Sequence, residues 1–360
     1  MDIVELLTFT KQQGASDLHL SAGLPPMIRL HGSLRRLKMD PLGKEEVHKM
    51  LHEVLTEEQR KRFERDLELD FPCQVNGVAR FRVNAFRHER GEGAAFRVIP
   101  SEIPTLAQLN MPPVLAEMAL KEKGLILVTG PTGSGKSTTL AAMLNHINEN
   151  KYCHIVTVED PIEFIHEPKN SLIHQRELGG HTHSFAKALR SALREDPDVI
   201  LVGEMRDLET TSLAITAAET GHLVMGTLHT NSASKTIDRA IDIFTADARD
   251  QVRTMLAESI LAIVAQALIP RRDGKGRVAA LEVLIANTAI RNLIREGKTF
   301  QIPSIIQTSQ HLGMQSLDFH LKELVTKGTI TKEEALKKAL DAKSFGEIPV
   351  PEKPPLRKTN

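Results

Sequence analysis

The chain has 360 residues, 41% of them hydrophobic and 26% charged, which is enough for two globular domains, each with its own core. Lysine plus arginine equals aspartate plus glutamate at 46 each, so no overall positive charge favours nucleic acid as a partner. The two cysteines lack metal-type spacing, and no apolar run approaches the roughly 18 to 20 residues that cross a bilayer. These features predict a cytoplasmic protein without direct membrane insertion.

Residues 1–100 predict a small α+β domain. Its expected elements are a helix whose last part is residues 6–13, short strands at 18–21 and 26–30, and an amphipathic helix over 44–67. Strand-like runs at 80–86 and 94–99 follow, separated by the turn-rich segment Arg90-Gly91-Glu92-Gly93, so they predict a hairpin.

A linker is expected at residues 101–113, where prolines recur and no periodicity is present. From residue 114 to 345 strands alternate with helices, which predicts a mainly parallel sheet covered on both faces. The strands are expected at 125–129, 154–158, 198–202, 223–228 and 278–284, and later helices at 289–296 and 316–327. Residues 346–360 contain four prolines and predict a disordered tail.

The most informative segment matches the P-loop pattern G-x-x-x-x-G-K-[ST] directly after an apolar strand and before a helix. Its residues are Gly130, Pro131, Thr132, Gly133, Ser134, Gly135, Lys136, Ser137 and Thr138. Glycines let the backbone N–H groups curl around phosphate oxygens, and the helix adds its positive N-terminal end. Lys136 is expected to reach the β- and γ-phosphates, and Ser137 to bind Mg²⁺. The segment predicts binding of ATP with Mg²⁺.

The sequence Asp198-Val-Ile-Leu-Val-Gly-Glu204 looks like a Walker B strand. Ligands of a parallel doubly wound sheet bind at the carboxyl ends of its strands, and six steps place Asp198 roughly 20 Å from Glu204. Glu204 is therefore the carboxylate expected to orient or deprotonate the attacking water and to serve the metal site.

A second acidic segment, Glu159-Asp160-Pro161-Ile162-Glu163, leaves a strand at the same edge. Carboxylates crowded near phosphates repel unless a cation lies among them, so we expect Mg²⁺ there, with Glu163 as the first choice for a catalytic and metal-site role. The alternative is a solvated acidic turn.

His222 and His229 flank one strand about 23 Å apart, so both cannot contact one γ-phosphate. His229 lies at the productive end and is the candidate, whereas His222 is expected to be structural or to lie at an interface. Phosphoryl transfer also commonly uses an arginine finger. The predicted hairpin offers Arg82 and Arg97, and the alternative is a solvated charged sheet face.

Together these motifs resemble the type II/IV secretion ATPase superfamily. Residues 130–138, 158–163, 193–207 and 220–230 occur in the order of its Walker A, aspartate, Walker B and histidine boxes. Gly14-Ala-Ser-Asp-Leu-His-Leu20, residues 289–298 and residues 313–318 are similar to the type IV pilus retraction branch. The interval after the histidine box lacks the tetracysteine module usual in the assembly and secretion branches.

The resemblance implies an α/β fold with a RecA-like P-loop NTPase domain preceded by a smaller α+β PAS-like domain. It implies a homohexameric ATPase at the cytoplasmic face of the inner membrane, which works on a pilus platform protein and drives pilus retraction in twitching motility. It also implies that Arg82 and Arg97 approach the nucleotide from the N-terminal hairpin. The alternative is an accessory or regulatory nucleotide-binding ring, as for a paralogue of the retraction ATPase.

Overall fold

The computed structural model describes residues 2–30, 32–100 and 102–346. It contains two compact units, Met1–Glu102 and Ile103–Asn360, each with its own core. The predicted tail at 346–360 lies, apart from Gly346, outside the described residues. None of the described helices is long and apolar enough to span a membrane.

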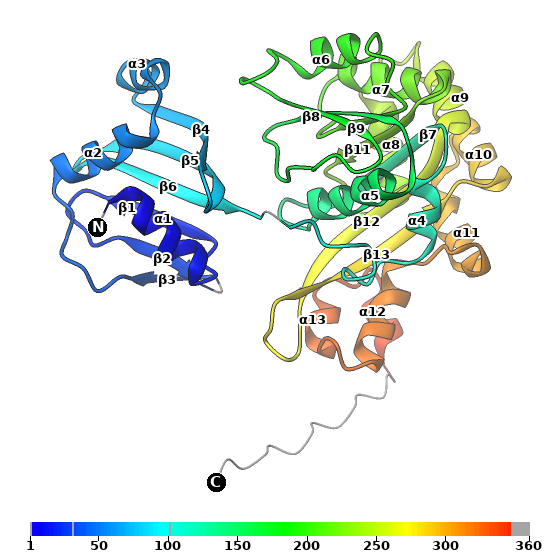
Figure 1. The fold of residues 1–360 in the computed structure, drawn as a ribbon. Coiled ribbons are helices and arrows are strands. Elements are labelled where there is room, and N and C mark those ends of the chain that lie inside the picture. Colours follow the sequence, from blue (N-terminus) through cyan, green and yellow to red (C-terminus); the bar gives the residue numbers. More distant parts are fainter. Residues whose placement is uncertain (1, 31, 101, 347–360) are drawn as a thin grey trace. The chain divides into compact units, whose positions relative to one another are not determined.

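The first unit is an antiparallel sheet with helices packed on one face (Figure 1). Its elements are α1 (Ile3–Gln12), β1 (Asp17–Ser21), β2 (Met27–Leu30), β3 (Ser33–Arg36), α2 (Lys44–Val54), α3 (Glu57–Asp66), β4 (Glu68–Val75), β5 (Ala79–His88) and β6 (Gly91–Ile99). The strand order is β3-β2-β1-β6-β5-β4. Residues of β5 alternate between core and solvent, because Phe81 and Val83 are buried and Arg82 between them is exposed.

The predicted hairpin is confirmed, since β5 and β6 pair antiparallel with Arg82 opposite Arg97. The single helix predicted over residues 44–67 is wrong. Leu55 adopts an extended conformation, and Thr56 begins a new helix by accepting a hydrogen bond from the Gln59 backbone N–H. A threonine followed three residues later by glutamine is a capping box, which restarts the helix at this point.

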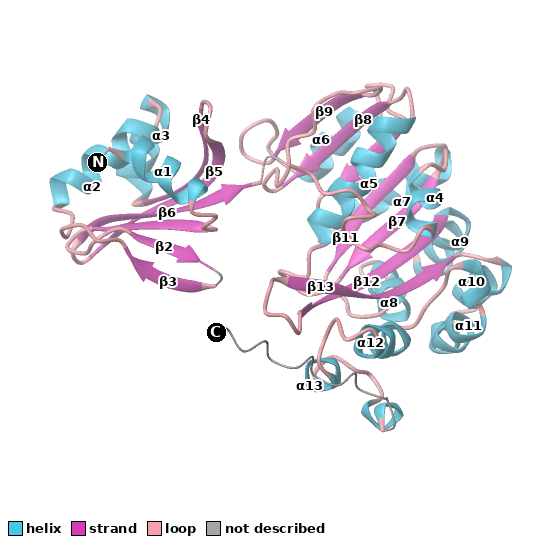
Figure 2. Ribbon diagram, turned by 60° about the horizontal axis from the view of Figure 1, so that its bottom comes forward, coloured by secondary structure: helices cyan, strands magenta, loops and turns pink. Residues whose placement is uncertain are grey.

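The second unit is a sheet with helices on both faces (Figure 2). Its strands are β7 (Gly124–Thr129), β8 (His154–Glu159), β9 (Leu172–Glu177), β10 (Val199–Val202), β11 (Leu223–Leu228), β12 (Ile260–Pro270) and β13 (Arg277–Ile285). The order is β13-β12-β7-β11-β10-β8-β9, parallel except for the β12–β13 pair. The mainly parallel sheet and the α/β fold class are therefore confirmed.

Helices cover the two faces because the central strands are apolar on both sides. The longer helices are α4 (Val114–Ala119), α5 (Lys136–Asn150), α6 (Phe185–Ala192), α7 (Leu208–Thr220), α8 (Ala233–Asp242), α9 (Arg249–Ser259), α10 (Thr288–Arg295), α11 (Ile302–Thr308), α12 (Leu317–Thr326) and α13 (Lys332–Leu336). On β7, Leu125 and Leu127 join the core under α7 to α9, whereas Ile126 and Val128 join the core under α4 and α5.

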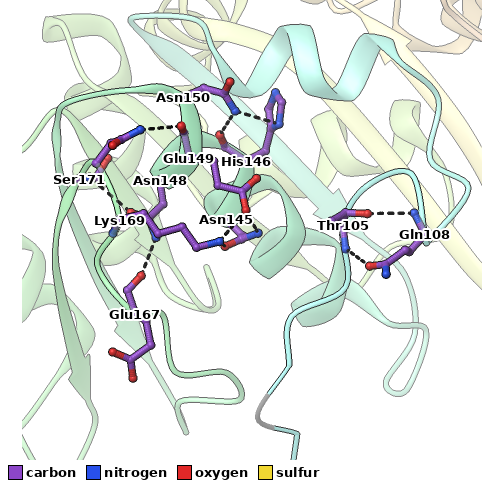
Figure 3. Close-up of polar contacts among 11 residues, drawn as sticks. Thr105, Gln108, Asn145, His146, Asn148, Glu149, Asn150, Glu167, Lys169 and Ser171 are labelled. Carbon is purple, nitrogen blue, oxygen red and sulfur yellow. Dashed lines mark hydrogen bonds and ion pairs between the residues drawn. The ribbon is translucent and has the colours of Figure 1, made fainter.

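Part of the predicted linker belongs to the second unit. Leu106 and Met111 are buried in the core beneath α4 and α5. The backbone around Leu106 is held by a reciprocal pair of hydrogen bonds: the Thr105 N–H donates to the Gln108 side chain, and the Gln108 N–H donates to the Thr105 hydroxyl (Figure 3).

Candidate functional site

The P-loop residues 130–135 connect β7 to α5, as the sequence predicts. Gly130, Gly133 and Gly135 all have positive φ, and a Cβ at Gly130 would lie 2.3 Å from the Gln266 carbonyl oxygen. Only glycine fits such a backbone, which leaves the loop curled tightly over the start of α5.

Lys136 lies inside this curl. Its Nζ donates to the carbonyl oxygens of Gly130, at 3.0 Å, and Pro131, at 3.3 Å. Burial lowers the pKa of Lys136, while the carboxylate of Glu204 acts in the opposite direction. Glu204 is therefore close enough to the P-loop lysine to affect its charge, although 68 residues separate them in sequence.

Gln266 on β12 braces the loop and is a residue that sequence reasoning missed. Its Nε2 donates to the Ser134 carbonyl at 2.6 Å, and its Oε1 accepts from the Thr139 hydroxyl at 2.8 Å. Both bonds are buried, so they fix the loop against the first turn of α5. The sequence feature that marks Gln266 is its amide side chain, which stands alone within the otherwise apolar run of residues 260–269.

Glu204 follows β10 and lies at the carboxyl edge of the sheet. The parallel pairings of β10 with β8 and β11 place residue 203 level with the ends of those strands. Asp198 lies at the opposite end, where its Oδ2 accepts the His154 backbone N–H at 2.8 Å. The strand-end argument for choosing Glu204 over Asp198 agrees with this register.

Glu204 Oε1 lies 2.5 Å from Arg206 Nε and 3.0 Å from His229 Nε2. Burial alone would raise the pKa of Glu204, but the hydrogen bonds and charges of Arg206 and His229 outweigh it, so the net pKa is lowered. The side chain is thus held as a carboxylate. Arg206 was missed in the sequence, although it stands only two residues beyond Glu204.

The acidic segment after β8 reaches the same edge, but its carboxylates differ in environment. Glu159 is buried, and its Oε1 accepts from the Thr157 hydroxyl at 2.7 Å. Burial raises the pKa of Glu159 in spite of that bond and of the Glu163 backbone N–H, which also donates to this carboxylate. Glu163 itself is half-buried.

A cavity of about 30 Å³ lies between these groups; its lining includes Ser137, Glu159, His166, Gly203 and Thr227. This cavity lies between the Ser137 hydroxyl of the P-loop and the carboxyl ends of β8, β10 and β11. A larger hollow of about 660 Å³ opens beside the loop, where Pro131, His229 and Gln266 line it together with Lys235 of α8 and residues 337–340. Its volume suits a small organic ligand.

Neighbouring segments fix the acidic residues and the P-loop helix relative to each other. The Asn148 side chain near the end of α5 donates to the Glu167 carbonyl at 2.8 Å and accepts the Lys169 N–H at 2.9 Å (Figure 3). On β9, Gln175 accepts the His166 N–H, and Glu177 accepts the Ile162 N–H.

The remaining predicted residues are Arg82 and Arg97, which lie in the first unit. They are opposite each other on the solvent face of the hairpin. Arg97 Nε lies 2.9 Å from Asp17 Oδ1, so a buried carboxylate holds its guanidinium in place. His222 lies at the opposite edge of the second sheet, where its Nδ1 is 3.0 Å from the Ala217 carbonyl oxygen.

A P-loop, a carboxylate after the central strand and a histidine after its neighbour, on one edge of a doubly wound sheet, define a P-loop NTPase. Residues 3–337 match the Type II/IV secretion system protein family. The chain therefore belongs to that family.

Named relatives narrow the comparison. The chain is 59% identical over 345 residues to the type IV pilus retraction ATPase PilT of Pseudomonas aeruginosa, covering 96% of this chain and 100% of the relative. It is 54% identical to a twitching motility protein of Neisseria gonorrhoeae, covering 95% and 92% of the two chains. A crystal structure of the pilus retraction motor PilT with bound ADP superposes with a TM-score of 0.90 at 48% identity, covering 96% and 98%.

Proposed function

We propose that this chain is an ATP-hydrolysing motor that retracts type IV pili and supports twitching motility. The observation that carries this is the joining of a complete P-loop to Glu204 and His229 on one sheet edge, in a chain 59% identical to a named retraction ATPase over that relative's full length. The ADP-bound relative supports the use of adenine nucleotides.

Different residues bind the phosphates, bind the metal ion and orient the attacking water. The backbone N–H groups of residues 130 and 132–138, together with Lys136, bind the phosphates. Ser137, Glu163 and Glu204 would hold Mg²⁺, and the ion would supply positive charge beside the phosphates. Glu204 orients the attacking water. Its lowered pKa keeps it ionised but makes it a weak base, so orientation contributes more than proton abstraction.

We assign two roles to His229. Its Nε2 lies 3.0 Å from Glu204 Oε1 and stabilises the ionised carboxylate, and we propose that His229 also donates a hydrogen bond to the γ-phosphate. Arg82 and Arg97 complete the site as arginine fingers.

The same proposal covers assembly and location. The chain works as a homohexamer in the cytoplasm, at the inner-membrane base of the pilus, against the platform protein and in some systems with a related accessory ATPase. The competing proposal is a nucleotide-binding ring with a regulatory role. Complete Walker A and B residues favour the motor, because a regulator needs binding but no turnover.

Lys136→Ala tests both the enzyme and the motor. We expect ATP turnover to fall at least about 100-fold, because the cation that binds the phosphates is lost. The fold should be retained, because Nζ donates to the loop carbonyls and closes no core. The control is Lys275→Ala, an exposed lysine in a turn of the same unit.

In cells, deleting the gene should leave pili on the surface but abolish twitching. Wild type and Lys275→Ala should restore motility, and Lys136→Ala should not. Motility restored by Lys136→Ala would reject the motor and leave the regulatory ring.

A further inference from the structure

A cluster of metal-ligand side chains lies in the first unit, apart from every residue of the ATPase site described above. His48 and His52 are four residues apart on α2, so their side chains share one face of the helix. Glu92 comes from β6, which packs beside α2. One potential ligand atom from each residue lies within 4.8 Å of the other two.

The contacts within this cluster are close. His48 Nδ1 lies 3.1 Å from Glu92 Oε2, and the two imidazole rings have centroids 3.9 Å apart. Glu92 is only 8% exposed. His52 Nε2 is buried, and no other described group forms a hydrogen bond with it. A buried ring nitrogen without a partner loses its hydration without replacement, which is costly unless something binds there.

An ion pair alone explains part of the arrangement. Arg87 Nη2 lies 3.4 Å from Glu92 Oε1 and occupies that carboxylate oxygen, while Oε2 faces the histidines. His52 Nε2 takes part in neither the Arg87–Glu92 contact nor the His48–Glu92 contact. The pair therefore leaves His52 unexplained.

Two neutral imidazoles and one carboxylate are the ligand types that Zn²⁺ and similar ions prefer. We propose that His48, His52 and Glu92 form a binding site for a divalent transition-metal ion, with Zn²⁺ as the best match. Three protein ligands leave a fourth position for water, and a hollow of about 360 Å³ lined in part by His48, Glu92 and Lys44 gives the solvent access.

The metal would have a structural effect on the first unit. It would tie α2 to the start of β6, the strand whose other end carries Arg97. A ligand that binds the folded state raises its stability according to its concentration and affinity, so the first unit should become more resistant to unfolding when Zn²⁺ is present.

The test uses the untagged full chain with Mg²⁺ in excess, titrated with Zn²⁺ against a chromophoric chelator. We expect about one Zn²⁺ per chain. His52→Ala removes an imidazole ligand, and Glu92→Gln replaces the anionic carboxylate by a neutral, weaker amide donor, so each should weaken binding at least about tenfold. His48→Ala is the variant that preserves the fold most safely, because 54% of the His48 side chain is exposed. Co²⁺ absorption in the visible range gives a second readout of an imidazole-containing site.

The matched control is His174→Ala in the second unit. His174 forms a close histidine pair of its own, with Nδ1 2.9 Å from His154 Nε2, and it is exposed. This variant should bind Zn²⁺ like wild type, and Zn²⁺ should raise its thermal transition equally. Zn²⁺ bound equally by wild type and by both His48→Ala and His52→Ala, or lost only in His174→Ala, overturns the proposal, as does a wild type that takes up no stoichiometric metal.

Discussion

Glu204 and Asp198 are acidic residues at the two ends of one strand, and their side chains contact different groups. Glu204 is linked to Arg206 and His229 at the P-loop edge, whereas Asp198 accepts a backbone N–H at the far edge. The same side-chain chemistry therefore lies beside the P-loop at one end, where we propose a catalytic role for Glu204, and supports strand pairing at the other.

Replacing each carboxylate by its amide separates these roles. Glu204→Gln should bind ATP but lose turnover by about 100-fold or more, because the shape is kept and the charge is removed. Asp198→Asn should keep turnover within about twofold, because an amide oxygen can still accept the His154 N–H. Nucleotide binding and steady-state hydrolysis measure both. An inactive Asp198→Asn beside an active Glu204→Gln would reverse the assignment.

His166 is a buried histidine beside the small cavity. Burial, with a smaller contribution from the charge of Lys169, lowers the pKa of His166 to about 4. The unfolded chain therefore takes up a proton near pH 6.5 that the folded chain does not take up until about pH 4. Below pH 6.5 the unfolded state binds more protons, so the folded state loses stability as the pH falls through this window.

We expect His166 to cost the second unit about 2 kcal/mol of unfolding free energy between neutral pH and about pH 5. His166→Leu should remove that part of the pH dependence. Calorimetry of the transition that ATP shifts upward measures it, with the exposed His311→Ala as control. A loss of stability on acidification that is equal in wild type and His166→Leu would show that His166 titrates normally.

Among the elements, α5 carries the P-loop at its start and holds the acidic segment at its end. The Asn148 side chain is fully buried and bonds to the backbone of Glu167, Lys169 and Ser171. Because that stretch continues from Glu163, the helix links two parts of the site through a single amide.

Asn148→Ala should destabilise the second unit by about 1 to 3 kcal/mol, because it leaves buried backbone groups without partners. It should also lower turnover by loosening the acidic segment. Asn150→Ala is the control: this neighbouring asparagine is exposed and bonds mainly to its own helix, so its effect should stay within about 0.5 kcal/mol. Chemical denaturation and hydrolysis assays on both variants test the difference.

The sequence predicted those elements whose signals are local. The P-loop is contiguous, and the ends of parallel strands follow from counting residues, so Lys136, Glu204 and His229 could be placed on one edge. β9 and β12 were missed, and with them the bracing by Gln175 and Gln266. Those contacts cross up to 132 residues of sequence, and no local pattern reports such a distance.

The N-terminal prediction failed where two signals competed. Phe63 of α3 follows the apolar positions of α2 at a helical spacing, so periodicity alone allows one helix, but the Thr56 capping box outweighs it. The sequence does contain that signal, as threonine followed by glutamine three residues later.

At the scale of the whole molecule, the catalytic residues we propose are divided between two units. Lys136 and Glu204 belong to the second unit, and Arg82 and Arg97 to the first. Asp17 holds Arg97 in place. Burial alone would raise the pKa of Asp17, but the hydrogen bonds from Ser16 and Arg97 and the charge of Arg97 outweigh it, so the net pKa is lowered. Asp17 thus fixes Arg97 on the solvent face of its sheet, opposite the exposed Arg82.

A site completed across a subunit boundary predicts activity that depends on assembly. Arg82→Ala and Arg97→Ala should each lose turnover about 10³-fold or more, the amount an arginine finger contributes, with both units still folded. Specific activity of the wild type should also fall on dilution, because separated subunits lack the arginines of their neighbours. Light scattering and hydrolysis measured over the same concentration series test this.

Mixing two inactive variants gives the sharpest test of the shared site. Subunits with Arg97→Ala keep an intact P-loop, and subunits with Lys136→Ala keep intact arginines. Half of the interfaces between unlike subunits therefore pair an intact P-loop with intact arginines. The mixture should therefore hydrolyse ATP faster than either variant alone, while mixing Lys136→Ala with Glu204→Gln, both altered in the second unit, should restore nothing. Because the arginines and the P-loop would then come from different chains, hydrolysis by isolated monomers at full rate would refute both the shared site and the ring motor built on it.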